Sequence, residues 1–207
     1  LNVIKMNSSK TKRKSFPTTE DLVQKAKYEY DNAGSDIEPI PVKNESQAAK
    51  EIEYLIAKIQ EGVEWDEQVS AIKRGMGLVN GGALNYDIFV SKLINISYGL
   101  IQCACNLRSA LVRVSCLFLS QLAQHMKSKF SIFGDVITPL SKQTSHGTLI
   151  IAESCKLTIY QVAKFCQKKS TFLSVIELSK SKAPANRQIC SDSCVLMLQF
   201  WGQRIIK

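Results

Sequence analysis

Histidine is nearly absent from this chain: only His125 and His146 occur in 207 residues, and they are well separated. A Ser–His or Cys–His nucleophile therefore has no recognisable arrangement in the sequence. Neither a Gly-x-Gly-x-x-Gly pattern nor a Walker loop is present, so no phosphate-binding loop is predicted. We expect no catalytic residues, no cofactor and no enzymatic activity.

The cysteines also lack the spacing that a metal site requires. No Cys-x-x-Cys occurs, and neither histidine lies close to a cysteine pair, so four zinc ligands cannot be assembled from neighbouring residues. Most of the cysteines lie in apolar runs, where a free thiol packs as a small hydrophobic group. We predict no metal and interpret them as core thiols of a reducing compartment. The seven are Cys103, Cys105, Cys116, Cys155, Cys166, Cys190 and Cys194.

Long apolar runs are missing as well. The most apolar stretch, 85–122, is interrupted by Lys92, Arg108 and Arg113, and it falls short of the roughly 18 apolar residues of a membrane span. Residues 1–17 are basic and polar without a following apolar run, so no signal peptide is predicted. We expect a soluble, cytoplasmic protein with no membrane partner, and a first residue other than Met suggests part of a longer protein.

Positive charge is abundant, and it gathers at the two ends of the chain. The formal net charge is +9, residues 1–17 carry five bases and no acid, and residues 154–207 carry nine bases against two acids. Such an excess favours an acidic partner, which could be nucleic acid, an anionic membrane or an acidic protein, although it could also keep the surface solvated. The sequence has no recognition-helix or aromatic-plus-basic strand signature, so we expect no nucleic-acid partner.

The pattern of residues divides the chain into three parts. Residues 1–18 are predicted to be a flexible basic leader, and residues 19–45 a short helix followed by an extended strap. The helix opens with threonine and acidic residues, which are typical of a helix start. Pro39 and Pro41 force the residues before them into an extended conformation. The main domain is predicted to occupy residues 46–207.

Within the main domain, apolar residues recur at spacings of three and four, which indicates amphipathic helices. Eight such helices in four antiparallel pairs, with about 40 residues per pair, are typical of an all-α HEAT-repeat solenoid; an irregular helical bundle is the alternative. The glycines at 75, 77, 81 and 82 are interpreted as the stop of the second helix. The predicted helices are 46–62, 65–79, 86–105, 107–125, 130–142, 148–167, 170–179 and one ending near 201.

Several segments resemble one known family. The acid–Trp–acid start of a basic amphipathic helix, Glu64 to Arg74, is similar to the opening of the second helix in TOG domains of the CLASP (cytoplasmic linker-associated protein) N-terminal type. The small residues and Tyr-Asp pair of 81–87 and the Asn-Leu-Arg-Ser turn of 106–113 follow in the expected order. Lys129-Phe130 and the segment 196–201 keep the family's spacing, so the resemblance covers residues 46–201.

This resemblance implies a flat paddle of stacked HEAT repeats whose turns along one edge bind tubulin or the microtubule lattice. Tryptophan and arginine are also the residues most often found at interface hot spots. Trp65 could instead be a core residue beside Val69 and Ile72, and the bases of the last turn could simply be solvated. The tubulin-binding residues that the resemblance implies are Trp65, Arg108, Ser109, Thr148, Lys182 and Arg187.

The chain also departs from the family. The third turn has Leu149 where the family usually has a lysine nearby, and the fourth keeps Arg187 but has Gln188 and Ile189 beside it. A complete TOG domain has six repeats, and this chain has about four. The alternative function is therefore a structural HEAT scaffold, for example in a ciliary or flagellar axoneme, that binds another microtubule-associated protein or the lattice without acting on free tubulin.

Overall fold

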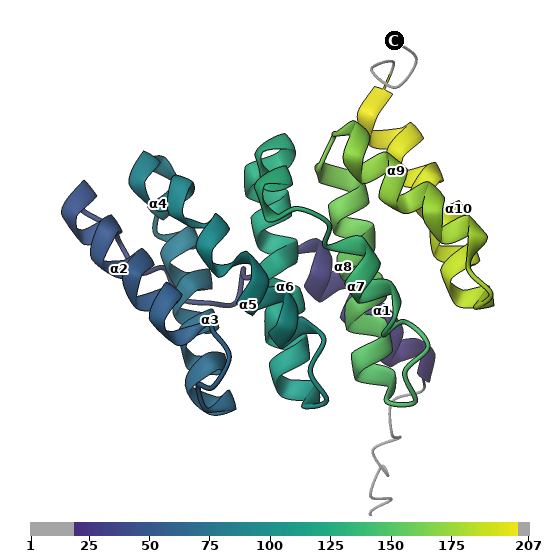
Figure 1. Ribbon diagram of the computed structural model, residues 1–207, viewed down its shortest axis with the longest axis horizontal. Helices are drawn as coiled ribbons and strands as arrows, with labels where there is room; N and C mark the ends of the chain where they lie inside the picture. Colours follow the sequence, from purple (N-terminus) through teal and green to yellow (C-terminus); the bar gives the residue numbers. More distant parts are fainter. Residues whose placement is uncertain (1–18, 203–207) are drawn as a thin grey trace, which may run out of the picture.

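The computed structural model describes residues 19–202, and every regular element in that range is helical (Figure 1). The predicted leader, 1–18, lies outside the described residues. The prediction of an all-α fold is confirmed. The α-helices are α1 (Thr19–Asp31), α2 (Glu45–Lys58), α3 (Trp65–Asn80), α4 (Asp87–Lys92), α5 (Ile94–Ala104), α6 (Ser109–Met126), α7 (Ile137–Ser141), α8 (Leu149–Phe165), α9 (Lys169–Glu177) and α10 (Pro184–Trp201). The 3-10 helices are η1 (Ala83–Asn85), η2 (Lys127–Phe133) and η3 (Leu178–Lys180).

The helices form four antiparallel pairs stacked side by side. The first helices of the pairs, α2, α4 with α5, α7 and α9, make one layer, which we call layer A (Figure 1). The second helices, α3, α6, α8 and α10, make layer B, in which each helix packs against the next. The predicted helical-repeat array is therefore confirmed, and the irregular bundle is excluded.

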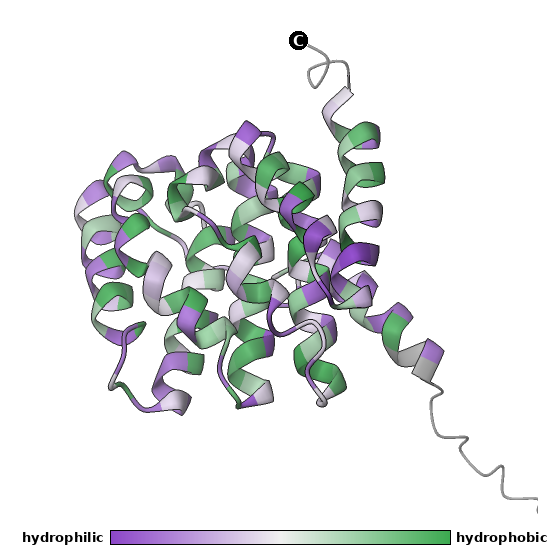
Figure 2. Cartoon of the chain, turned by 45° about the vertical axis from the view of Figure 1, so that its right-hand side comes forward, coloured by the Kyte–Doolittle hydropathy of each residue, from purple (hydrophilic) through white to green (hydrophobic). Residues whose placement is uncertain are grey.

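The apolar stripes read from the sequence face the space between the layers. Ile52 and Leu55 of α2 and Ile72 of α3 are completely buried. Helix α6 is buried over most of its surface because α3, α5, α8 and α1 all pack on it. Two buried serines of α6, Ser115 and Ser120, donate to carbonyls one turn earlier in the same helix, so they bring no unpaired hydroxyl into the core. Bands of apolar and polar residues alternate along the helices in Figure 2.

Helix α1 and the strap cover part of layer B before the chain enters α2. Helix α1 packs on α8 and α6. The strap then crosses α3, where the Ile40 amide donates to the Gly77 carbonyl at 2.8 Å. The side-chain amide of Asn80 donates to the carbonyls of Gly34 and Ile37, which anchors the start of the strap.

This crossing corrects the interpretation of the glycines in α3. A Cβ at Gly81 would lie 1.8 Å from the Ile40 carbonyl oxygen, and one at Gly77 would lie 2.9 Å from the Glu38 carbonyl oxygen. These two glycines therefore allow the strap to approach the helix closely. Only Gly82, with a φ of 89°, adopts the left-handed conformation typical of a helix stop.

Two predicted helices differ from those observed. The helix expected over 86–105 is broken at Leu93 into α4 and α5. The helix expected over 130–142 is split into the end of the 3-10 helix η2, which stops at Gly134 with a φ of 71°, and the short α7. Asp135 then accepts hydrogen bonds from the amides of Ile137 and Thr138 and starts the short α7. Over residues 19–202, no helix combines the length and the apolar character needed to cross a bilayer.

Candidate binding edge

The four turns that join layer A to layer B lie along the same edge, the lower edge in Figure 1. We call it the A-to-B edge, and its turns are 59–64, 105–108, 142–148 and 181–183. Trp65, Arg108 and Ser109 lie at its first two turns, Thr148 at the third, and Lys182 and Arg187 at the fourth. The sequence-predicted residues therefore share one edge, in three separate groups.

Trp65 and Arg108 are the predicted residues that the fold brings into contact. Trp65 is the first residue of α3 and remains 38% exposed. The guanidinium carbon of Arg108 lies 5.2 Å from the centre of the Trp65 ring, within the range of a cation–π contact. The backbone amide of Arg108 donates to the Asn106 side-chain oxygen at 3.0 Å, which fixes this turn. Trp65 is thus a surface residue, and buried Ile72 carries the core stripe of α3.

A hollow of about 720 Å³ lies between the first two turns. Gly62 and Val63 line it from the first turn, and Leu107 and Arg108 line it from the second. Leu107 is 80% exposed, and Tyr98 of α5, which also lines the hollow, is 67% exposed. Sequence reasoning missed Tyr98 and Leu107. Their positions outside the apolar stripes were the available signal, because large apolar residues off the buried face often serve recognition.

The hollow also depends on a close approach between repeats. A Cβ at Gly99 of α5 would lie 2.0 Å from the Ile59 carbonyl oxygen, so α5 contacts the end of α2 directly. The buried side chain of Gln68 donates to the Gln60 carbonyl at 2.8 Å and holds the first turn. The first two turns therefore form one supported surface rather than two independent loops.

The charge around Trp65 is mixed. Glu64 and Asp66 flank it and are exposed, while Glu67 pairs with Lys58. Acids in the first turn of a helix are favoured by the helix dipole, so their presence at the start of α3 has a local explanation. Arg108 places the positive charge of this surface directly over the indole ring.

The third turn presents apolar residues instead of a base. Thr148 is exposed at the start of α8, and its amide donates to Nδ1 of His146 at 3.0 Å. Leu149 and Ile150 follow it and are about half exposed. They also line a hollow of about 270 Å³ against α1, beside Arg113.

The two bases of the fourth turn differ in their surroundings. Lys182 is exposed and makes no ion pair with any residue in 19–202. Arg187 is also exposed, but its Nη1 donates to the carbonyls of Ser181 and Lys182 at 2.8 and 2.9 Å. Arg187 thus holds the turn together, which sequence reasoning did not anticipate.

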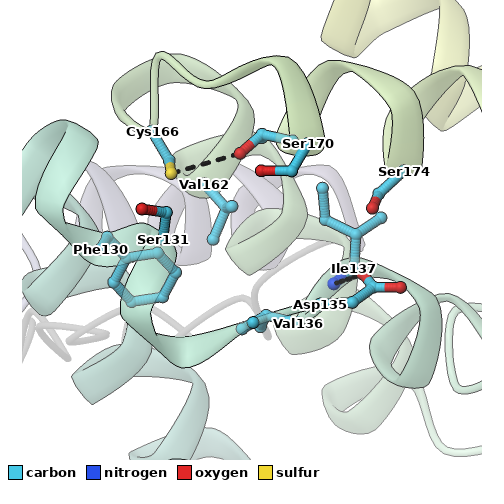
Figure 3. A pocket seen from close by; sticks show the side chains of 11 residues that line it. Phe130, Ser131, Asp135, Val136, Ile137, Val162, Cys166, Ser170 and Ser174 are labelled. Carbon is cyan, nitrogen blue, oxygen red and sulfur yellow. Dashed lines mark hydrogen bonds between the residues drawn. The ribbon is translucent and has the colours of Figure 1, made fainter. Parts of the chain in front are cut away.

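A second concave site of about 220 Å³ lies between η2, α7, α8 and α9 (Figure 3). Ser131, Ser170, Ser174 and Cys166 line it, together with Asp135. Burial raises the pKa of the Cys166 thiol, which disfavours the reactive thiolate, and the Asp135 carboxylate caps α7. No histidine or lysine is among the lining residues. That the chain is not an enzyme stays a prediction.

The thiols are mainly core residues, as predicted. Five of the seven are buried, while Cys105 and Cys194 are half-buried, and all seven are free. Within residues 19–202, no group of three or more His, Cys, Asp or Glu side chains is arranged to hold a metal ion. The absence of a metal from the protein stays a prediction.

The fold is that of a helical-repeat protein in which four inter-helix turns lie along one edge. No family model matches the sequence. The chain is 29% identical over 167 residues to a CLIP-associated protein of Arabidopsis thaliana. The aligned region covers 80% of this chain and 12% of that protein. It is 26% identical over 160 residues to CLIP-associating protein 1-B of Xenopus laevis, and this alignment covers 74% of this chain and 11% of that protein. The chain is thus a distant homologue of the CLASP proteins, as the motifs predicted.

The chain is also similar to an uncharacterized protein and to a designed one. An uncharacterized protein of Dictyostelium discoideum is 26% identical over 166 residues, which covers 79% of this chain and 20% of that protein. Among solved structures, a designed armadillo repeat protein has 10% identity, with a TM-score of 0.32, over 88% of this chain and 96% of that chain. The chain spans between 11 and 20% of the length of these curated relatives.

Proposed function

We propose that this chain is a microtubule-associated module of the TOG type that contacts tubulin through its A-to-B edge. Trp65 is the anchor of this contact and Arg108 its principal base. The observation that carries the proposal is the half-exposed indole of Trp65, held beneath the Arg108 guanidinium at the start of a helix. The similarity to CLASP proteins supports the same function.

The geometry of this pair suits an interface anchor. The stacked guanidinium limits the rotamers of both side chains before binding, so less conformational entropy is lost when a partner covers them. The adjoining hollow, with Leu107 and Tyr98, supplies apolar surface around the charged group. A centre of this kind, in which an arginine and an aromatic residue are surrounded by apolar contacts, is typical of interface hot spots.

The basic residues along the A-to-B edge are proposed to attract tubulin electrostatically. Arg108 and Lys182 are exposed and make no ion pair within residues 19–202, so their charges are available to the acidic surface of tubulin. Exposed charges of this kind mainly accelerate association and make binding sensitive to salt. We therefore expect binding to weaken as ionic strength rises.

One observation favours a second function, a scaffold that binds another protein. Leu149 and Ile150 make the third turn apolar, and the hollow that they share with α1 extends this surface. An apolar surface of this kind suits a protein partner without strong negative charge. Another microtubule-associated protein would fit this description.

The test is co-sedimentation with microtubules beside size-exclusion chromatography with free tubulin. Trp65→Ala is expected to weaken binding roughly tenfold or more, as hot-spot truncations do. Tyr54→Ala is the matched control, because Tyr54 is 41% exposed and lies under a cation, Arg74, at 5.6 Å, but on the bodies of α2 and α3 away from the turns.

Each outcome decides between the two functions. Binding that is lost in Trp65→Ala and kept in Tyr54→Ala supports the proposed edge. If Trp65→Ala binds as tightly as Tyr54→Ala, Trp65 is not the anchor of the contact. If wild-type protein binds neither microtubules nor free tubulin, the scaffold function replaces the proposal.

A further inference from the structure

The edge opposite the proposed tubulin contact carries a cluster of lysines. This B-to-A edge is formed by the turns that lead from layer B back to layer A, the upper edge in Figure 1. Lys127 and Lys129 lie in η2 after α6, and Lys168 and Lys169 lie at the start of α9. All four are exposed, and none forms an ion pair with a residue in 19–202.

An apolar hollow of about 320 Å³ lies within this cluster. Val90 of α4, Ile94 of α5 and Ile132 of η2 supply its aliphatic lining, and Lys129 and Lys168 border it. Ile94 is 51% exposed and is the first residue of α5, directly after the break at Leu93. The volume is at the lower end of the roughly 300–1,000 Å³ of small-ligand sites, so it has room for a large side chain.

No acid lines this hollow. Asp135 lies on the same turn as Lys129. Its carboxylate accepts hydrogen bonds from the backbone amides of Ile137 and Thr138 at the start of α7. The positive charge of the lysines is therefore not compensated at the hollow itself. Positive charge around a concave, low-dielectric surface attracts anionic partners.

Lys127 gives independent support for this charge. It is the only non-glycine residue in 19–202 with a positive φ, at φ 51° and ψ −124°, a conformation that favours glycine. Residues held in such conformations cluster at functional sites, where the surrounding structure enforces the strain. A lysine at this position is thus consistent with a need for its charge.

We propose that the hollow and Lys127, Lys129, Lys168 and Lys169 together bind an acidic peptide segment that carries one large apolar side chain. The apolar side chain enters the hollow between Ile94 and Ile132, and flanking carboxylates contact the lysines at its border. This surface lies on the opposite edge from Trp65, so it operates independently of the proposed tubulin contact.

The lining favours a peptide over other anionic partners. Single-stranded nucleic acid is usually held by aromatic side chains on which bases stack, and the residues around this hollow are aliphatic. A membrane surface requires a protruding apolar face that inserts among lipids, whereas this apolar surface is recessed. A concave aliphatic site with a basic rim is complementary to an apolar residue among acids.

The test is fluorescence anisotropy with a labelled glutamate-rich peptide that contains one central leucine, at about 50 mM salt so that charge effects are not screened. The second probe is the same peptide with serine in place of leucine. Lys129→Glu/Lys168→Glu is expected to weaken binding of the leucine peptide roughly tenfold, because charge reversal at a rim converts attraction into repulsion. Ile94→Ser is expected to reduce it to the affinity of the serine peptide.

The matched control is Lys50→Glu/Lys73→Glu, which makes the same change in net charge at exposed lysines of α2 and α3. It is expected to change the affinity less than about twofold. Thermal melting of each variant confirms that the fold is retained, and Trp65→Ala is expected to bind the peptide normally. Equal weakening by the two lysine pairs overturns the proposal. So does an oligouridine probe that binds more tightly than the peptide and is lost in Lys129→Glu/Lys168→Glu.

Discussion

The carbonyl oxygen of Ile40 lies so close to the α-carbon of Gly81 that a Cβ at position 81 would be 1.8 Å from it. The contact joins the strap to the end of α3, and the Val42 amide donates to the Gly81 carbonyl just beyond it. Since both partners are backbone, neither can move away by changing a rotamer. This crossing holds the strap against α3 of layer B.

Gly81→Ala is therefore expected to destabilise the protein by at least the ~1–3 kcal/mol typical of overpacking. Urea unfolding measures the change in the free energy of unfolding. Gly147→Ala is the control, since a Cβ there meets no atom within 4 Å, and its effect should stay within about 0.5 kcal/mol. A Gly81→Ala protein as stable as wild type would show that the strap can leave α3 at little cost.

Trp201 provides a second long-range contact that can be tested. Its indole Nε1 donates to the Ala163 carbonyl at 2.8 Å, and that carbonyl is one of the last four of α8, which have no partner within the helix. Trp201→Phe keeps the apolar ring but leaves this carbonyl unpaired in a buried place. We expect a loss of about 1–2 kcal/mol in the free energy of unfolding.

Trp65→Phe is the natural comparison for this variant. It makes the same chemical change at an exposed indole, where water can replace any lost hydrogen bond, and should cost less than about 0.5 kcal/mol. Similar losses in the two variants would mean that the Trp201 hydrogen bond contributes nothing beyond the removal of an indole. The measurement is chemical denaturation of both proteins beside wild type.

The sequence predicted the layered helices well, because each helix buries a stripe whose spacing is visible locally. Ile52 and Leu55 of α2 and Ile72 of α3 follow this spacing and are completely buried. The break at Leu93 was not predicted, because a helix that turns at a leucine carries no proline or glycine signal. The role of Gly81 also escaped notice, because it depends on a strap residue 41 positions away.

The candidate site was predictable only in part. The resemblance placed Trp65 and Arg108 on adjoining turns, but their stacking depends on the offset between repeats, which sequence spacing does not reveal. The resemblance implies a binding role for Arg187, but its hydrogen bonds to the carbonyls of Ser181 and Lys182 form only in the folded chain. The lysines of the B-to-A edge come from turns about 40 residues apart, so their proximity is likewise a product of the stacking.

The buried thiols predict a dependence of stability on alkaline pH. Burial raises the pKa of Cys103 and of Cys105 to about 11, from an ordinary value of 9.0. The folded state therefore holds the thiol protons more tightly than the unfolded state. The stability that these thiols contribute is fully present below pH 9 and is lost as the pH rises towards 11.

Urea unfolding at several pH values across this window measures the effect. Cys103→Ala/Cys105→Ala should lose less free energy of unfolding between pH 9 and 11 than wild type, because lysines and tyrosines titrate equally in both proteins. Parallel pH profiles for the two proteins would mean that these thiols do not contribute to the alkaline loss.

Replacing Lys127 with glycine is expected to stabilise the fold and to weaken binding of the acidic peptide. Its φ of 51° and ψ of −124° are readily adopted by glycine, so Lys127→Gly should stabilise the fold by about 1 kcal/mol through relief of strain. The same change removes one of the four lysines of the proposed peptide site and should weaken binding of the acidic peptide. Lys129→Gly removes an equal charge where φ is not positive, and it should weaken binding without any gain in stability.

Arg187 and Arg108 are expected to have different roles on the A-to-B edge, the first in stability and the second in binding. Its guanidinium donates to the carbonyls of Ser181 and Lys182, so Arg187→Ala should lower the free energy of unfolding by about 1 kcal/mol. Arg187→Lys should recover part of this, because both hydrogen bonds come from the single nitrogen Nη1 and an ammonium can also donate to two carbonyls. Since the guanidinium is occupied in the turn, microtubule binding should weaken less in Arg187→Ala than in Arg108→Ala. The opposite order in co-sedimentation would move the centre of the proposed contact from the first two turns to the fourth.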